Sequence, residues 1–152
     1  MERKWQELSI IIVSLENSSR MTKRGIFEII YTPEGITVRI EPGKDGDVWM
    51  TVNDIVKAYG VFYPTVKAGL KALKKSGDFD ECQDLRIEKF LYKGKQCSVE
   101  LYGLKTVIAL GFRMNGTVCQ LFRKWAASRI AQSYRHKPSA LFLCMKGNMA
   151  MN

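Results

Sequence analysis

Residues 51–77 read TVNDIVKAYGVFYPTVKAGLKALKKSG, and this stretch decides how the rest of the chain is interpreted. Thr51 and Asp54 have the spacing of a capping box, in which a hydroxyl and a carboxylate satisfy the free N–H groups at a helix start. A helix is therefore predicted to begin at Val52. It is predicted to end at Gly60, because glycine readily takes the left-handed conformation that follows a helix.

A second helix is predicted to start near Pro64, which suits a first helical turn because it has no N–H group, and to run to about Lys75. Val66, Leu70 and Leu73 follow at i, i+4 and i+7, so they form one apolar face. The opposite face carries four positive charges and no negative one. Its outward residues are Thr65, Lys67, Ala68, Lys71, Lys74 and Lys75.

The two helices have the spacing of a helix-turn-helix. Gly60 is the ninth residue counted from Val52, where the turn requires glycine, and Val61 and Val66 are placed to close the core between the helices. A recognition helix presents basic and small polar residues to phosphates and base edges. The same pattern fits any two packed antiparallel helices, so the spacing leaves both interpretations open.

Strand patterns lie on both sides of the helix pair. Ile26–Thr32 and Ile36–Ile40 are predicted to form a hairpin, and Val48–Met50 a third strand, so we expect a three-stranded β-meander before the helices. After them, Leu85–Tyr92 and Gln96–Leu101 are predicted to form a second hairpin. Its three-residue connection is Lys93-Gly94-Lys95, so this hairpin resembles the wing of a winged helix, with the lysines at its tip.

Two further helices are predicted over Leu104–Arg113 and Thr117–Tyr134. The second has an apolar stripe in which Trp125 is expected to be part of the core, whereas Arg123 and Lys124 lie off the stripe. We therefore predict an α+β, winged-helix-like domain over residues 25–136. It is preceded by an arm or short helix over 1–24, suited to pairing with a second copy, and followed by a tail over 137–152.

The charge of the chain is unevenly distributed. The 152 residues include 24 Lys and Arg and 15 Asp and Glu, for a net charge of +9. No acidic residue follows Glu100, whereas eight basic residues do. Clustered cations attract phosphates and release counterions, so this asymmetry favours a polyanionic partner. A solvated basic surface kept for solubility is the alternative.

Other classes of function lack support in the sequence. The longest apolar runs, Leu8–Leu15 and Thr106–Phe112, are far shorter than the roughly 20 residues of a membrane span. The four cysteines are widely spaced and His136 is the only histidine, so neither a zinc site nor an imidazole base is expected. The acidic cluster at Asp78, Asp80, Glu81 and Asp84 lacks the spacing of a calcium-binding loop and is predicted to be a solvated loop. We expect a cytoplasmic protein without cofactor, metal, small-molecule ligand, membrane contact or enzymatic activity.

Several short blocks carry a resemblance over about three-quarters of the chain. They are Ile29-Ile30-Tyr31, Gly35, Val38-Arg39-Ile40, Val48-Trp49-Met50-Thr51, Tyr59-Gly60-Val61, Leu101-Tyr102-Gly103-Leu104, Ile108–Asn115 and Gln120–Ala126. With these blocks the chain resembles the N-terminal region of bacterial RhuM-type virulence proteins. Phe122-Arg123-x-Trp125 is also similar, more distantly, to the end of the Bro-N and KilA-N domains of phage antirepressors.

The resemblance implies DNA binding through the helix-turn-helix-like segment. Relatives tend to carry Ser, Thr, Arg and His at the start of the second helix, where this chain has Phe62, Tyr63, Pro64, Ala68 and Gly69. We therefore expect contact with the DNA backbone rather than base readout, with double-stranded DNA as the partner. The expected contact residues are Thr65, Lys67, Ala68, Lys71, Lys74, Lys75, Lys93, Lys95, Arg123 and Lys124. The alternative is a protein-interaction or virulence-associated effector module that docks a partner through Phe62 and Tyr63.

Overall fold

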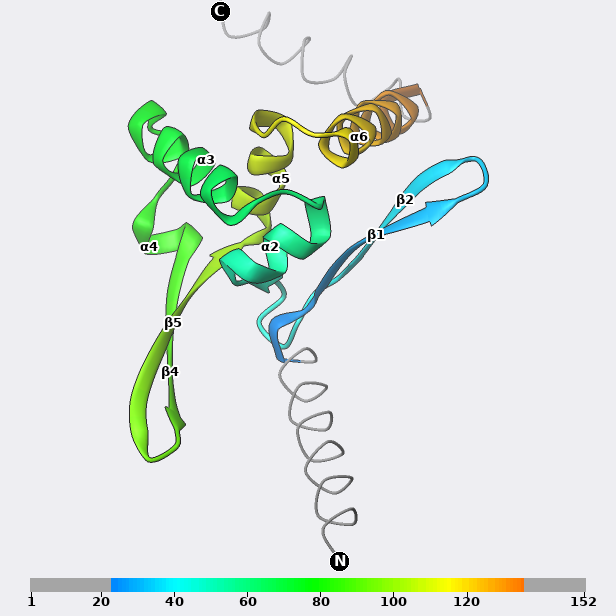
Figure 1. Cartoon of the computed structure of the whole chain (residues 1–152). Coiled ribbons are helices and arrows are strands. Elements are labelled where there is room, and N and C mark those ends of the chain that lie inside the picture. Colours follow the sequence, from blue (N-terminus) through cyan, green and yellow to red (C-terminus); the bar gives the residue numbers. More distant parts are fainter. Residues whose placement is uncertain (1–22, 136–152) are drawn as a thin grey trace, which may run out of the picture.

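The computed structural model describes residues 23–135, which form an α+β fold with five helices and two small antiparallel sheets (Figure 1). The arm and tail predicted over 1–24 and 137–152 lie outside this range, apart from Lys23 and Arg24. In chain order the elements are β1 (Ile26–Thr32), β2 (Gly35–Glu41), β3 (Trp49–Met50), α2 (Val52–Tyr59), α3 (Tyr63–Ser76), α4 (Glu81–Asp84), β4 (Leu85–Tyr92), β5 (Lys95–Gly103), α5 (Leu104–Arg113) and α6 (Thr117–Arg135).

The helix pair forms as the capping pattern predicts. The Thr51 hydroxyl accepts from the Asp54 backbone N–H at 3.1 Å, and the Asp54 carboxylate accepts from the Thr51 N–H at 3.0 Å. Gly60 closes α2 in the left-handed conformation, with φ 61° and ψ 37°. Both helices of the predicted pair are therefore confirmed, with bounds that differ from the predicted ones by one residue or less.

The first hairpin is confirmed, but the predicted three-stranded meander is wrong. β1 and β2 pair in register from Ile26 opposite Glu41 to Thr32 opposite Gly35 and form a sheet of two strands. The loop after β2 is closed by its own hydrogen bonds, including one from the Gly43 N–H to the Asp47 carbonyl at 2.9 Å. This turn leads β3 away from β2, so β3 joins the other sheet.

The second sheet has the strand order β3-β5-β4. Trp49 pairs with Gly103 and Met50 with Tyr102, while β4 and β5 form the second predicted hairpin. Its connection has two residues rather than the predicted three, because Tyr92 and Lys95 are already paired. Lys93 and Gly94 both have positive φ, 49° and 73°, as a type I′ turn requires.

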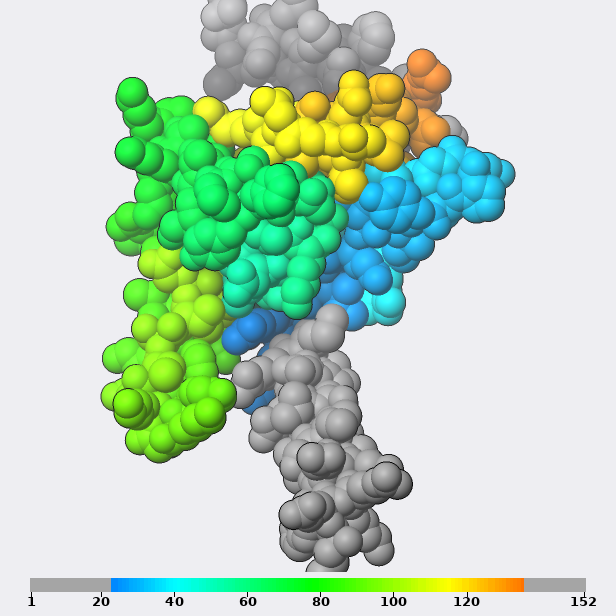
Figure 2. Space-filling view, viewed as in Figure 1, coloured from blue at the N-terminus to red at the C-terminus, as the bar shows by residue number. Residues whose placement is uncertain are grey.

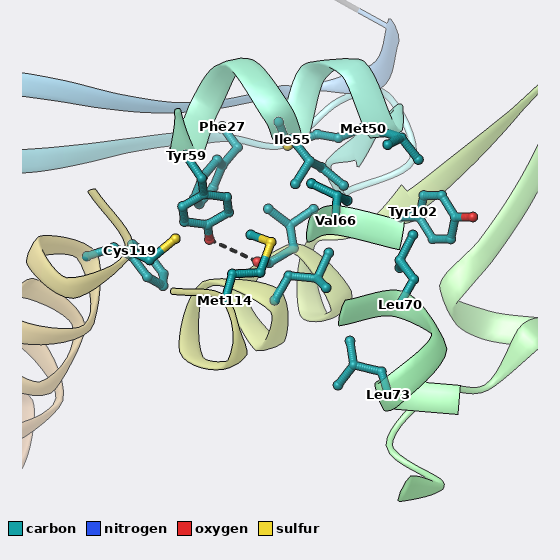
Figure 3. Close-up of a cluster of buried hydrophobic side chains, with 14 of the residues drawn as sticks. Phe27, Met50, Ile55, Tyr59, Val66, Leu70, Leu73, Tyr102, Met114 and Cys119 are labelled. Atoms are coloured by element: carbon teal, nitrogen blue, oxygen red, sulfur yellow. Dashed lines mark hydrogen bonds between the residues drawn. The ribbon is translucent and has the colours of Figure 1, made fainter. Parts of the chain in front are cut away.

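The core lies where α2, α3, α5 and α6 meet (Figure 3). The buried Tyr59 hydroxyl donates to the Val107 carbonyl at 2.9 Å and so links α2 to α5. The Tyr59 ring lies 5.8 Å from that of Phe27 and 5.4 Å from that of Phe122, centroid to centroid. Trp125 is half-buried and stacks on Phe122 at 6.2 Å, so it packs against the core as predicted.

Gly69 lies inside α3, where glycine costs about 1 kcal/mol relative to alanine. A Cβ atom at this position would lie 2.7 Å from Cδ2 of Leu110 on α5, closer than van der Waals contact allows. The glycine therefore lets α3 and α5 approach closely. This contact fixes which face of α3 is buried and which is left for solvent or a ligand.

The acidic segment before β4 is not the simple loop predicted. Residues 81–84 form the short helix α4, whose N-cap Asp80 accepts from the Cys82 N–H at 2.9 Å. Asp84 is buried, accepts from the Asp80 N–H at 2.9 Å and lies 3.6 Å from the Lys105 ammonium. Asp78, Asp80 and Glu81 are exposed, as predicted for a solvated segment, whereas Asp84 is buried beside Lys105.

Candidate nucleic-acid interface

Three lysines form a row along the exposed side of α3. Lys67, Lys71 and Lys75 follow at intervals of four residues, so neighbouring positions are about 6 Å apart along the helix axis. All three are exposed, and none forms an ion pair with any residue of the described part of the chain. The buried row of Val66, Leu70 and Leu73 packs into the core and holds these lysines outward.

Lys74, the fourth predicted lysine of α3, already has partners. Its ammonium lies 3.3 Å from the Glu81 carboxylate and 5.2 Å from the centre of the Phe79 ring. These contacts tie the end of α3 to α4. The free positive charge of the helix therefore comes from three lysines rather than four.

Thr65 and Ala68 lie toward the turn between α5 and α6. Thr65 is half-buried and Ala68 is exposed. Both line a shallow groove of about 630 Å³ whose other wall includes Arg113 and Asn115. The two predicted contact residues thus belong to the side of α3 next to the lysine row.

The start of α3 is apolar and exposed. Phe62, the N-cap residue, is 82% exposed and Tyr63 is 48% exposed, and no side chain caps the helix start. The first turn holds no acidic residue. The N–H groups of this turn carry the positive end of the helix dipole, which adds to the positive potential of the lysine row.

The β4–β5 hairpin holds the two lysines predicted for the wing. Lys93 and Lys95 flank its tip, are exposed, and form no ion pair with a described residue. The Lys93 ammonium lies 5.3 Å from the centre of the Tyr92 ring. Figure 2 shows α3 and this hairpin on the same face of the molecule.

Arg123 and Lys124 are neighbours on α6 with different environments. The Arg123 guanidinium donates to the Gly111 carbonyl at 3.1 Å and to the Met114 carbonyl at 2.9 Å. It therefore satisfies carbonyl groups at the end of α5, which lack partners within the helix. Lys124 is exposed on the side of α6 opposite its buried residues Cys119, Phe122 and Ala126.

Other cations beyond Glu100 also take part in internal contacts. Arg113 lies 3.5 Å from the Asp78 carboxylate and donates to the Ser76 hydroxyl at 3.0 Å. The hydrogen bond from Ser76 and the charge of Arg113 hold the pKa of the Asp78 carboxyl below its ordinary value. Some of the basic residues that follow Glu100 therefore form ion pairs and hydrogen bonds that hold α5 against α3 and α4.

The described residues offer little for catalysis or metal binding. Within residues 23–135 no group of three or more His, Cys, Asp or Glu side chains is placed to hold a metal ion. Burial raises the pKa of the Cys119 thiol and of the Tyr59 hydroxyl, so neither is an activated nucleophile. In the same range no helix has the length and apolar character needed to cross a bilayer.

Sequence reasoning missed part of the hairpin surface. Lys89 is exposed and forms no ion pair with a described residue, and Leu91 on the same strand is 76% exposed. The alternation of Ile87, Lys89 and Leu91 places them on one face of β4. That pattern was visible in the sequence, but it does not tell which face of the hairpin is left uncovered.

Comparison of the chain with protein-family models, with curated proteins and with solved structures found no match.

Proposed function

We propose that this protein binds double-stranded DNA through α3 and the β4–β5 hairpin. The observation that carries the proposal is the row of Lys67, Lys71 and Lys75 on the exposed side of α3, without an acidic partner among the described residues. A row of cations about 12 Å long suits a phosphate backbone, because each neutralised phosphate releases condensed counterions. Lys89, Lys93 and Lys95 add a second group of exposed cations on the hairpin.

The arrangement around α3 supports a winged-helix-like mode of binding. A short strand, two helices and a hairpin follow one another, and the short strand pairs with the second strand of the hairpin, giving the order β3-β5-β4. In this mode the second helix of the pair lies against the duplex and the hairpin acts as a wing beside it. α3 would then lie in or along the major groove, which is wide enough to admit a helix.

We expect the protein to contact the sugar-phosphate backbone of DNA rather than to read the base edges. The start of α3 presents Phe62 and Tyr63, and Ala68 occupies its middle, so few side chains there can donate to base edges. The lysine ammonium groups are point charges on flexible stems and lack the rigid planar fork with which arginine makes bidentate contacts. The resemblance to RhuM-type and Bro-N or KilA-N proteins agrees with this proposal and stays a prediction.

A salt titration of binding to a duplex of random sequence tests the proposal. The lysines of α3 and the hairpin that form no ion pair with a described residue are Lys67, Lys71, Lys75, Lys89, Lys93 and Lys95. If each of these six neutralises one phosphate, log K should fall with log salt concentration with a slope of about −5. Lys67→Gln/Lys71→Gln should reduce the size of this slope by about 1.8. Lys44→Gln is the matched control, because Lys44 is an exposed lysine on the loop between β2 and β3. A slope near zero, or an equal change in the control, would overturn the proposal.

A second candidate function is binding of a partner protein through the start of α3. The exposure of Phe62, 82%, is the observation that favours it, because large exposed aromatic residues anchor protein interfaces. If this surface serves a protein partner alone, Phe62→Ser/Tyr63→Ser leaves the salt slope and affinity for duplex DNA unchanged. If α3 binds DNA, the same substitutions change the affinity, since these side chains then lie at the interface.

A further inference from the structure

The exposed face of the β4–β5 hairpin carries two large apolar side chains among polar ones, which include Gln96, Ser98 and Glu100 of β5. Ile87 and Leu91 lie on this face and are 59% and 76% exposed, with Lys89 between them. The solvent face of an antiparallel hairpin is ordinarily polar, because that face gains nothing from burying apolar side chains. Exposed apolar side chains next to cations therefore indicate a surface that is covered when a partner binds.

The opposite face of the hairpin is better protected. Glu88, Phe90, Cys97 and Val99 alternate with the exposed residues and are all half-buried. Glu88 also accepts from Arg24 at 3.0 Å, a contact that ties the hairpin to the segment just before β1. This contact fixes the orientation of the hairpin, so the Leu91 side chain lies on the exposed face.

The charges on the hairpin define the kind of partner. Residues 89–98 contain Lys89, Lys93 and Lys95 and no acidic residue. The carboxylate of Glu100, which lies opposite Ile87, accepts from the Tyr102 hydroxyl at 2.6 Å. Contact with a polyanion is therefore favoured at the distal part of the hairpin, around Leu91, and disfavoured at its base.

We propose that the distal hairpin enters the minor groove of duplex DNA and that the Leu91 side chain wedges between two base pairs and bends the duplex. This inference rests on the DNA-binding function proposed above. Apolar side chains that enter the minor groove in this way unstack a base step and kink the helix axis. The lysines around Leu91 would then lie between the two phosphate strands that border the groove.

The dimensions of the hairpin agree with this placement. Six residues separate Leu85, at the base of β4, from Leu91, which gives a reach of about 20 Å. The minor groove next to a major groove bound by α3 lies about half a helical turn away, or roughly 17 Å. The hairpin projects from the helices as an arm in both Figure 1 and Figure 2, and its length is sufficient.

Fluorescence energy transfer between the ends of a 20-base-pair duplex tests the wedge. The duplex carries a central TA step, because pyrimidine–purine steps kink readily. Saturating wild-type protein should raise the transfer efficiency about twofold, as a bend of roughly 60° brings the ends closer. Leu91→Ser should abolish the rise in transfer efficiency but keep the salt slope of binding. Leu91→Met, which keeps an apolar side chain, should retain the rise. Ile87→Ser, the matched control at the base of the hairpin, should bend the duplex as the wild type does.

The outcomes separate this inference from the proposed function. Binding of the wild type with the expected salt slope but no change in transfer would overturn the wedge and leave the DNA-binding function standing. Absence of any binding to the duplex would overturn both. Vesicles of phosphatidylserine and phosphatidylcholine serve as the competing probe. If the wild type sediments with them, Leu91→Ser does not, and no bending occurs, the exposed Leu91 side chain serves to contact an anionic lipid surface and the wedge is wrong.

Discussion

Arg123→Ala should destabilise the domain without changing how the folded protein binds DNA. The Arg123 guanidinium makes two hydrogen bonds, to the carbonyls of Gly111 and Met114, at 3.1 Å and 2.9 Å. A hydrogen bond to a charged group contributes about 1.5–3 kcal/mol, and the half-exposed position of Arg123 lets water replace part of it. Taking about 1 kcal/mol for each bond, we expect the free energy of unfolding to fall by about 2 kcal/mol.

Urea unfolding followed by circular dichroism measures this loss. For a slope m of about 2 kcal/mol per molar urea, the midpoint of Arg123→Ala should fall by about 1 M. Lys124→Ala is the neighbouring control, because Lys124 is exposed and forms no ion pair with a described residue, so its midpoint should shift by less than about 0.3 M. If Arg123→Ala unfolds like the wild type but loses DNA affinity and salt slope, Arg123 contacts DNA and its assigned structural role is wrong.

Two further substitutions test the core and the contacts of Asp78 with Arg113 and Ser76. Gly111→Ala should lower the free energy of unfolding by about 2 kcal/mol, because its Cβ would lie 2.5 Å from the Tyr59 hydroxyl and 2.6 Å from the Phe122 ring; a midpoint equal to the wild type in urea would contradict this packing. Asp78→Asn should lower the thermal midpoint at neutral pH. The pKa of Asp78 is depressed in the folded state, so its contribution is present above the ordinary value of 3.8 and is lost as the pH falls through the lowered pKa. The two midpoints should therefore converge once the pH is below the lowered pKa, and a difference that persists or grows in that more acidic range would show that the carboxylate is not the cause.

The local elements of this fold could be predicted from the sequence because short-range signals set them. The capping box at Thr51 and Asp54, the glycine at 60 and the alternation in both hairpins depend on neighbours within a few residues. The pairing of β3 depends instead on Gly103 and Tyr102, more than 50 residues away, and a strand of two residues carries no pattern that identifies its partner. Its place in the second sheet was therefore not predictable.

The same distinction between short-range signals and contacts of distant segments applies to the candidate site. The helical period predicted correctly that Lys67, Lys71 and Lys75 lie outside the buried row of α3. It could not show that Lys74 pairs with Glu81 or that Arg123 binds two carbonyls of α5, because both contacts join separate elements. The net charge likewise counts every cation equally, whereas the structure separates the cations that hold helices together from those that are exposed without an ion-pair partner among the described residues.

The most direct test of the DNA-binding account is a map of which backbone amides respond to DNA. Nuclear magnetic resonance spectra of the ¹⁵N-labelled protein, titrated with a short duplex at low salt, provide it. The account predicts that the largest shifts fall within α3 and the distal β4–β5 hairpin, residues 63–76 and 89–96. The β1–β2 hairpin, whose single cation Arg39 is paired with Glu28 and Glu41, should not respond. Shifts confined to residues 26–41, or no shifts at saturating duplex, would contradict the account.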